Sequence, residues 1–402
     1  MTRHLIIGGS DAGISAALRI RELDPTADVT VVAAEAYPNF SICGLPFFLS
    51  GEVPDWRNLA HRQAPEIEAH GIGLQLNQRA EKIDPAARTV LLVAPDGAAR
   101  HVKYDRLLVA TGAESVRPPI EGLDAPGVFF LRWMDDSFAV KALMDRRQPR
   151  RAVVVGGGYI GLEMADALTR RGLAVTLMEF APEVLTTLDP ELGALIRAEL
   201  EAQGVHVITG QAVKRIARQT AGLVVQTADG GGAATDMVIV AAGARPSTNL
   251  ATTAGIGTGA GGAIRADRTM ATSVADIWAA GDCAETWHRM LARNVYLPLG
   301  TTAHKQGRVA GENMLGGKRE FQGSLGTQVV KVFDRVAARS GLRDREAREA
   351  GFDPLTVALT VWDHKVYYPG ANRIHLRLTG DRGSGRLLGV QVVGRRTAEI
   401  AK

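Results

Sequence analysis

The chain has 402 residues, of which 46% are hydrophobic and 22% charged, with a formal net charge of +4 at pH 7. This length exceeds that of one compact core and predicts two to four domains. The basic residues are scattered, which argues against a nucleic-acid-binding protein. The sequence has no run of ~20 apolar residues and no signal-peptide pattern, which argues against a membrane-spanning or secreted protein. We therefore expect a cytoplasmic protein.

The first predicted element is a strand at residues 5–7, followed by a glycine turn, an Ala-rich helix and a second strand at residues 29–32. In such a unit the turn lets the backbone approach a pyrophosphate, which then lies at the positive end of the helix. The carboxylate of Glu35, just after the second strand, is the candidate partner of a ribose, and the alternative is a solvated loop glutamate. The predicted contacts in the turn are Gly8, Ser10, Asp11 and Gly13.

Cys43 follows in the segment Tyr-Pro-Asn-Phe-Ser-Ile-Cys-Gly-Leu-Pro at residues 37–46. Pro46 suits the first turn of a helix, which would place Cys43 at a helix N-terminus. The helix dipole there favours a nucleophilic thiolate, whereas the alternative is an inert packed cysteine. The second of the two cysteines is Cys283, which we interpret as a packed residue, so the spacing predicts neither a disulfide framework nor a metal site.

A second strand, glycine turn and helix begin at residue 152, and another strand follows at residues 175–178. One such turn alone also serves ordinary strand–helix packing, but two copies in the same context predict two bound dinucleotides. Glu179 ends the second strand and Phe180 follows it, an arrangement that suits ribose hydroxyls better than a 2′-phosphate and favours NADH over NADPH. The predicted contacts in this turn are Gly156, Gly158, Tyr159, Ile160 and Gly161.

The remaining pattern completes a fold of the α/β class, with two Rossmann-like dinucleotide-binding domains and a C-terminal α+β domain. Further strands are predicted at residues 104–112, 237–243 and 276–282, and a strand-rich tail begins near residue 321. We expect the first domain to be split between residues 1–115 and 245–320, the second to span 116–244 and the third 321–402.

The segment around Cys43 resembles the cysteine motif of the pyridine nucleotide–disulfide oxidoreductase family, in its single-cysteine branch. That branch contains coenzyme A disulfide reductases, NADH oxidases, NADH peroxidases and polysulfide reductases. Ala-Thr-Gly-Ala at 110–113, Gly-Ala-Arg-Pro at 243–246, Ala-Gly-Asp at 280–282 and Tyr-Tyr-Pro-Gly-Ala at 367–371 extend the resemblance over essentially the whole chain. It implies FAD in the split domain, NADH or NADPH in the second domain, and a homodimer formed by the third.

The resemblance also implies a mechanism. Electrons would pass from NAD(P)H through FAD to an oxidised Cys43, held as a mixed disulfide with a small disulfide or polysulfide substrate. Phe48 stands where two-cysteine members of the family carry their second cysteine, so an internal disulfide is excluded. By the same resemblance Ala110, Thr111, Gly112 and Asp282 contact FAD, and Glu163 and Gly243 belong to the NAD(P)H side.

The sequence defines less clearly which molecule accepts the electrons. Members that use oxygen or peroxide carry a histidine at the position of Asp11, which disfavours an NADH oxidase or peroxidase acting through a Cys43 sulfenic acid. That activity stays the alternative, together with a redox-sensing flavoprotein. Tyr367 or Tyr368 is predicted to protonate the leaving thiolate or to steady the substrate, and the alternative is an aromatic pair that packs within the third domain. His304 is a candidate substrate or flavin contact, and Arg19 and Asn39 are candidate substrate contacts, each against an ordinary structural role.

The family pattern continues past Lys402. We therefore expect the dimerisation domain of this chain to be shortened, or its interface to be built differently.

Overall fold

The computed structural model describes residues 2–220, 222–367 and 369–395, and the chain divides by its internal contacts into two units. The first unit runs to Ser41 and resumes over Trp56–Glu114 and Ala244–Ser324. The second comprises Ile42–Asp55, Ser115–Gly243 and the chain from Leu325 onward. The predicted limits of the three domains remain a prediction.

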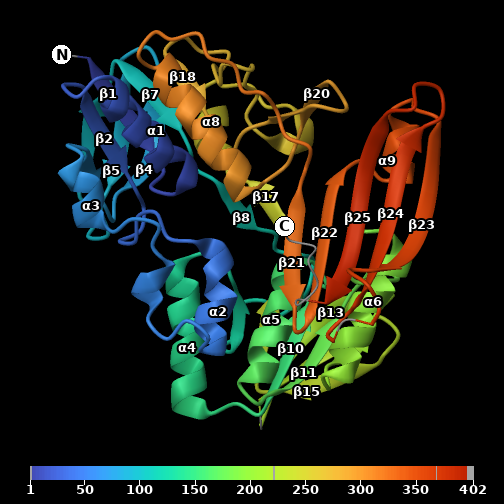
Figure 1. The fold of residues 1–402 in the computed structure, drawn as a ribbon. Coiled ribbons are helices and arrows are strands. Elements are labelled where there is room, and N and C mark those ends of the chain that lie inside the picture. The colour runs from blue at the N-terminus through green and yellow to red at the C-terminus, as the bar shows by residue number, and fades with distance from the viewer. Residues whose placement is uncertain (1, 221, 368, 396–402) are drawn as a thin grey trace. The chain divides into compact units, whose positions relative to one another are not determined.

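A five-stranded parallel sheet forms the centre of the first unit (Figure 1). Its strand order is β18-β7-β1-β2-β3, so the chain crosses over between neighbouring strands. Leu5, Ile6 and Ile7 are all at most 5% exposed, as expected for a parallel strand that is covered on both faces. The strands are β1 (Arg3–Ile7), β2 (Asp28–Val32), β3 (Gly73–Gln75), β7 (Arg106–Val109) and β18 (Ile277–Ala279).

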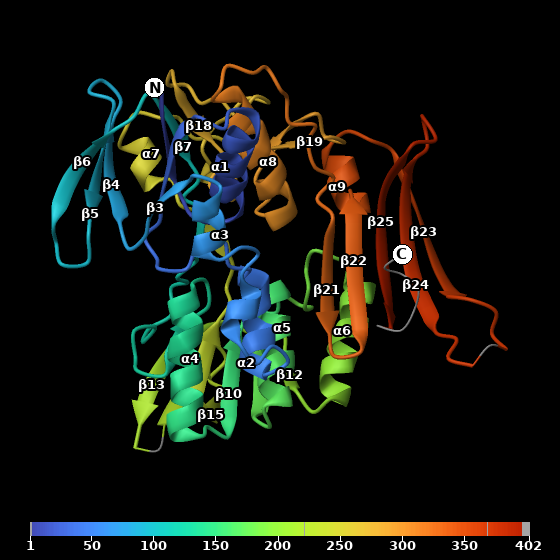
Figure 2. The same ribbon diagram turned by 60° about the vertical axis from the view of Figure 1, so that its left-hand side comes forward.

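Two long helices, α1 (Asp11–Leu23) and α8 (Gly300–Asn313), lie side by side in this unit (Figures 1 and 2). Glycines allow their close approach, because a Cβ atom at Gly307 would lie 2.1 Å from the carbonyl oxygen of Ala12. The unit also holds an antiparallel sheet of β4 (Arg79–Asp84), β5 (Thr89–Val93) and β6 (Ala99–Lys103). Its smaller elements are α3 (Ala64–Ala69), α7 (Asn249–Thr252), β8 (Ala113–Ser115), β17 (Ala244–Pro246), β19 (Thr286–His288) and β20 (Arg293–Val295).

The second unit repeats the parallel design in the order β12-β11-β10-β16-β9. The helix α5 (Tyr159–Arg170) follows β10 directly, and the short helix α2 (Leu45–Ser50) packs against it. The strands are β9 (Val128–Phe130), β10 (Arg151–Val155), β11 (Ala174–Met178), β12 (His206–Ile208) and β16 (Met237–Val240). The other elements of this part are α4 (Met134–Arg147), α6 (Pro190–Ala202), β13 (Val213–Gln219), β14 (Gly222–Thr227) and β15 (Gly232–Thr235).

A five-stranded antiparallel sheet completes the second unit, in the order β21-β22-β25-β24-β23, with the short helix α9 (Asp344–Glu349). The two parallel sheets and this C-terminal sheet confirm the predicted α/β class. Among the described residues, no helix combines the length and the apolar character needed to cross a bilayer. The strands of the C-terminal sheet are β21 (Gln328–Val332), β22 (Arg335–Gly341), β23 (Pro354–Trp362), β24 (Arg373–Asp381) and β25 (Leu387–Arg395).

Candidate active site

The first glycine turn joins β1 to α1 and leaves no room for side chains at two positions. Gly8 has a φ of +123°, and a Cβ atom there would lie 2.0 Å from the carbonyl oxygen of Ala110. At Gly13 a Cβ atom would lie 1.9 Å from the carbonyl oxygen of Gly8. Ser10 caps the helix without a side-chain hydrogen bond. The helix therefore begins with backbone N–H groups available to an anion.

The second glycine turn, between β10 and α5, has the same construction. Gly156 has a φ of +111°, and a Cβ atom there would lie 2.3 Å from the carbonyl oxygen of Ala241. A Cβ atom at Gly161 would lie 1.9 Å from the carbonyl oxygen of Gly156. At Gly158, by contrast, no described atom lies within 4 Å of the Cβ position. This open side of the turn is where a diphosphate could approach the backbone.

The carboxylate of Glu179 ties the end of β11 to the second glycine turn. Its two oxygens accept hydrogen bonds from the backbone N–H groups of Gly157 and Ala181, the latter at 2.7 Å. Glu35, its counterpart in the first unit, is partly buried, and its carbonyl oxygen accepts a hydrogen bond from the N–H of Asn77. Both carboxylates thus follow the second strand of a glycine-turn unit, the place from which ribose hydroxyls are bound in this type of fold.

Cys43 lies in the single turn Ile42–Gly44, immediately before α2. Its side chain is exposed, and Pro46 occupies the first turn of α2. Cys283, by contrast, is fully buried, and burial raises the pKa of its thiol. A buried protonated thiol is inert, so the exposure of the two thiols is consistent with Cys43 as the predicted reactive cysteine, and its role stays a prediction.

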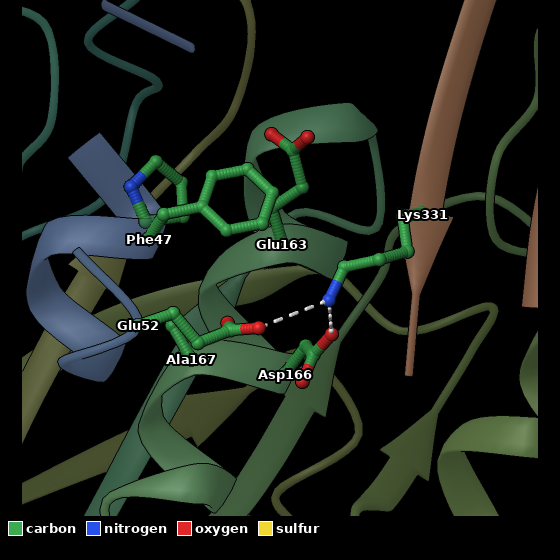
Figure 3. Close-up of a pocket in the computed structure, with 7 residues that line it drawn as sticks. Phe47, Glu52, Glu163, Asp166, Ala167 and Lys331 are labelled. Carbon is green, nitrogen blue, oxygen red and sulfur yellow. Dashed lines mark ion pairs between the residues drawn. The ribbon is translucent and has the colours of Figure 1, made fainter. Parts of the chain in front are cut away.

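A charged pocket lies between α2, α5 and β21 in the second unit (Figure 3). The ammonium group of Lys331 lies 3.6 Å from the carboxylates of both Glu52 and Asp166. It also lies 5.3 Å from the centre of the Phe47 ring, a cation–π distance. Burial raises the pKa of Glu163 to about 7; Lys331 opposes this shift and Asp166 adds to it. Glu163 can therefore change its protonation state near neutral pH.

In the first unit, Asp11 is approached by two imidazole groups. Nε2 of His304 lies 3.3 Å from Oδ1 of Asp11, and Nε2 of His61 lies 4.0 Å from the same oxygen. Nδ1 of His304 lies 2.8 Å from Oγ of Ser15 on α1. Asp11, a predicted cofactor contact at the start of α1, thus has two titratable side chains beside it, one from a loop and one from α8.

A family model described as "Pyridine nucleotide-disulphide oxidoreductase" matches residues 2–307 of the chain. The chain belongs to this family. Among curated proteins it is similar to the NAD(P)H sulfur oxidoreductase (CoA-dependent) of Pyrococcus abyssi, with 37% identity over 391 residues that cover 97% of this chain and 86% of the relative. It is also 32% identical to an NADH oxidase of Methanocaldococcus jannaschii over 394 residues, which cover 98% of this chain and 87% of that protein.

Solved structures agree with this assignment. The NAD-dependent persulfide reductase from A. fulgidus superimposes with a TM-score of 0.94 and 38% identity, covering 98% of this chain and 74% of that one. The predicted family and the predicted fold are therefore confirmed. Membership of the pyridine nucleotide-disulphide oxidoreductases implies FAD and a nicotinamide nucleotide, and the two crowded glycine turns fit two such dinucleotides.

Several other predicted cofactor residues of this oxidoreductase lie just after strands of the two parallel sheets. Thr111 follows β7, and its hydroxyl donates a hydrogen bond of 2.6 Å to the carbonyl oxygen of Ser247. Gly112 has a φ of +70° and accepts a bond from the N–H of Ser247. Asp282 follows Gly281, whose Cβ position would lie 2.9 Å from Cβ of Ala12 at the start of α1. Gly243, in the second unit, has a φ of +110°. Their roles toward the cofactors stay predictions.

The candidate substrate residues have different surroundings. Asn39 is 1% exposed, has a φ of +56°, and its amide oxygen and nitrogen have no hydrogen-bond partner among the described residues. A buried unsatisfied amide is costly, which is consistent with a ligand contact. Arg19 instead forms ion pairs with Glu312 at 2.7 Å and Glu22 at 2.9 Å. Its charge is already neutralised within the first unit.

The tyrosine pair of the third domain is only partly described. Tyr367 is 71% exposed, and the ammonium group of Lys365 lies 5.9 Å from its ring centre. Tyr368 lies outside the described residues. The proton-donor role predicted for one of these tyrosines stays a prediction.

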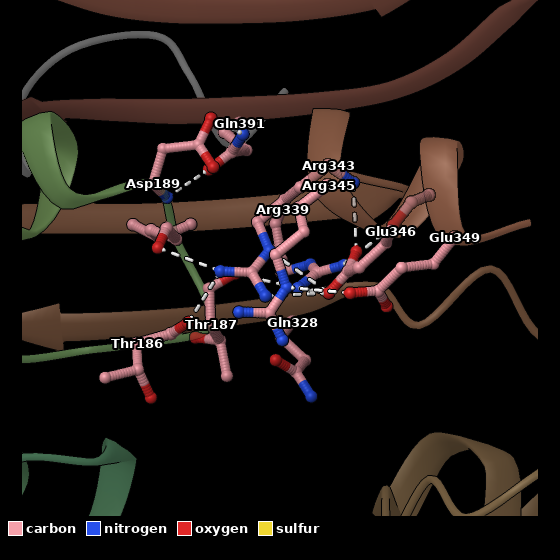
Figure 4. Close-up of polar contacts among 12 residues, drawn as sticks. Thr186, Thr187, Asp189, Gln328, Arg339, Arg343, Arg345, Glu346, Glu349 and Gln391 are labelled. Carbon is pink, nitrogen blue, oxygen red and sulfur yellow. Dashed lines mark hydrogen bonds and ion pairs between the residues drawn. The ribbon is translucent and has the colours of Figure 1, made fainter. Parts of the chain in front are cut away.

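The C-terminal sheet holds the loop that follows Glu179, through two arginines of this sheet region (Figure 4). Arg339 donates hydrogen bonds to the carbonyl oxygen of Thr187 and to the carboxylate of Glu346. Arg343 donates to the carbonyl oxygen of Thr186 and to the same carboxylate. These arginines therefore have a structural role in the second unit.

Tyr159, on the first turn of α5, is fixed by the same region. Its hydroxyl donates a hydrogen bond of 2.7 Å to the side-chain oxygen of Gln328 and accepts one from Thr187. Burial raises the pKa of Tyr159. Ile160 beside it is 38% exposed. The helix that follows the second glycine turn thus begins with one hydrogen-bonded aromatic side chain, Tyr159, and one exposed apolar side chain, Ile160.

Sequence reasoning missed two features of the candidate site. Lys331 was not singled out, although a lysine within the apolar run of β21 is an unusual residue for a strand of which Val330 and Val332 are buried. His61 was also missed, because a histidine in a polar loop carries no spacing signal. Its relation to Asp11 exists only in the folded chain.

Proposed function

We propose that this protein is an FAD-dependent NAD(P)H oxidoreductase that reduces a small disulfide, polysulfide or persulfide through Cys43. The observation that carries the proposal is one exposed cysteine placed directly before α2, with buried Phe48 rather than a second thiol five residues later. The names of the relatives from Pyrococcus abyssi and A. fulgidus, which refer to sulfur with coenzyme A and to persulfide, support this substrate class.

Bound FAD supplies a two-electron carrier between NAD(P)H and sulfur. The thiolate of Cys43 attacks one sulfur of the substrate, releases the other half as a thiolate, and forms a mixed disulfide. Two electrons then return Cys43 to the thiolate and release the second half, so that one NAD(P)H and one proton yield two thiols. Glu163, with its pKa near neutrality, is suited to hold or release a proton beside α2.

Anaerobic titration with NADH tests this function. The wild-type protein should develop the long-wavelength absorption of a thiolate beside an oxidised flavin, and Cys43→Ser should lose it while keeping bound FAD. Cys283→Ala is the matched control and should behave as the wild type, since Cys283 is buried. Turnover should require coenzyme A disulfide or polysulfide. Equal turnover by wild type and Cys43→Ser would rule the mechanism out.

An NADH oxidase is the second candidate function. Asp11 replaces the histidine expected in that branch, yet His304 and His61 bring imidazole groups to the same carboxylate. The similarity to an NADH oxidase of Methanocaldococcus jannaschii points the same way. Rapid oxidation of NADH by oxygen without an added disulfide would favour this activity over the first.

We also propose a cytoplasmic homodimer. Leu355, Val357, Leu359 and Val361 alternate along β23, and each is between 38% and 44% exposed. A row of exposed apolar side chains on one strand is suited to a second copy of the chain. Two cysteines that form no disulfide fit a reducing compartment.

A further inference from the structure

We propose that Asp11, His61 and His304 form a binding site for one divalent cation of the Zn²⁺ class. Each residue offers one ligand atom, and the three atoms lie within 4.8 Å of one another. All three residues belong to the first unit, so the site needs no contact with the second. The proposal does not depend on the substrate of the enzyme.

The distances suit a small cation. Ligand atoms held at about 2.0–2.2 Å from a tetrahedral zinc ion lie about 3.4 Å from one another. Oδ1 of Asp11 and Nε2 of His304 are already 3.3 Å apart. Nε2 of His61 lies 4.0 Å from the same oxygen, so this pair must close by about half an ångström. The two imidazole nitrogens, which lie within 4.8 Å of each other, would also have to approach, and the 46% exposure of His61 leaves its side chain free of tight packing.

The carboxylate of Asp11 is the second observation that points to a cation. Its Oδ1 is buried and accepts no hydrogen bond from any residue within 2–220, 222–367 or 369–395, although two imidazole nitrogens face it. A buried carboxylate oxygen without a donor is unfavourable. The other oxygen faces Gly300, where a Cβ atom would lie 3.0 Å away, so any larger residue at the start of α8 would disturb the carboxylate. A cation at Oδ1 would satisfy this buried carboxylate oxygen.

The surrounding contacts orient the ligands. With Nδ1–H of His304 donated to Oγ of Ser15 at 2.8 Å, the lone pair of Nε2 is directed toward Asp11, as a metal ligand requires. Ser15 and His304 lie on α1 and α8, which pack closely, so their separation is fixed by two long helices. The backbone N–H of His61 donates to the carbonyl oxygen of Asn39 at 2.9 Å and holds its loop in place.

Three protein ligands leave coordination positions open. Because His304 and His61 are 38% and 46% exposed, water or an anionic ligand could complete the shell from the solvent side. Without a cation, the same atoms would form only an ion pair between Asp11 and protonated imidazole groups. The two arrangements differ in one measurable property, which is saturable binding of a metal ion.

Isothermal titration of the FAD-loaded, chelator-treated protein, without an affinity tag, with ZnCl₂ at neutral pH tests the site. We expect one bound Zn²⁺ per chain, with a dissociation constant that rises at least 10-fold in His61→Ala and in Asp11→Asn. His101→Ala, which changes an exposed histidine on β6 of the same unit, should leave the constant unchanged. Flavin absorbance and the melting temperature of each variant show that it has folded.

Two results would overturn the proposal. One is the absence of saturable Zn²⁺ binding by the wild-type protein. The other is binding of equal strength by folded His61→Ala. Neither result would bear on disulfide reduction through Cys43, because the titration measures metal binding and not turnover.

Discussion

Replacing Glu163 with glutamine changes stability in a way that depends on pH. Burial raises the pKa of this carboxyl from 4.5 to about 7, so the folded protein binds the proton more tightly than the unfolded chain does. The free energy of unfolding therefore falls as the pH rises from about 4.5 to about 7, and the full loss is present above that range. At about 1.4 kcal/mol for each pKa unit, the ionised carboxyl costs about 3 kcal/mol at most. Glutamine carries no such cost.

Thermal unfolding of the FAD-loaded proteins at pH 5 and pH 8, at one ionic strength, measures this effect. The stability of Glu163→Gln minus that of the wild type should be about 2 kcal/mol larger at pH 8 than at pH 5. The melting temperature of the variant minus that of the wild type should therefore be a few degrees higher at pH 8. Glu349→Gln is the control, because this carboxylate is 61% exposed and its replacement should act equally at both pH values. A melting difference for Glu163→Gln that does not change with pH would refute the raised pKa.

Three further changes test separate parts of the structure. Gly161→Ala places a methyl group 1.9 Å from the carbonyl oxygen of Gly156. The KM for NADH should therefore rise at least 10-fold, while the flavin absorbance is kept. An unchanged KM would contradict the assignment of this turn to NADH binding. Asp166→Ala removes the acceptor of the N–H of Phe333 and a partner of Lys331, and should lower the stability by about 2 kcal/mol in urea unfolding. Val357→Glu should yield a monomer in light scattering, whereas Val357→Thr should keep the dimer; an unaltered mass for Val357→Glu would exclude β23 from the interface.

The parallel sheets could be predicted because the signals for them are local. A β-branched run, a glycine turn and an amphipathic helix are contiguous in sequence, and the crowding at Gly8 and Gly156 explains why only glycine fits. The strands of the C-terminal sheet were likewise indicated by their own composition. Local patterns therefore predicted the elements of each unit and its fold class.

Which charged groups of the candidate site lie together could not be predicted in this way. His61 and His304 reach Asp11 from a loop and from α8, and no motif links these segments. Arg19 shows a different difficulty. Its position on the first helix suggested a substrate contact, but its guanidinium group forms an ion pair with Glu312, nearly 300 residues later in the chain. Which charges are paired depends on contacts that form only on folding.

The predicted preference for NADH over NADPH rests on the surroundings of the second glycine turn. Glu179 presents a carboxylate at the end of β11, and a 2′-phosphate placed there would meet a like charge. Arg339 and Arg343 reach the following loop, but both give hydrogen bonds to Glu346 and to backbone carbonyl groups. Their charge is used to hold the loop rather than to attract a phosphate. We infer that a ribose with free hydroxyls, which can donate to Glu179, is the better fit.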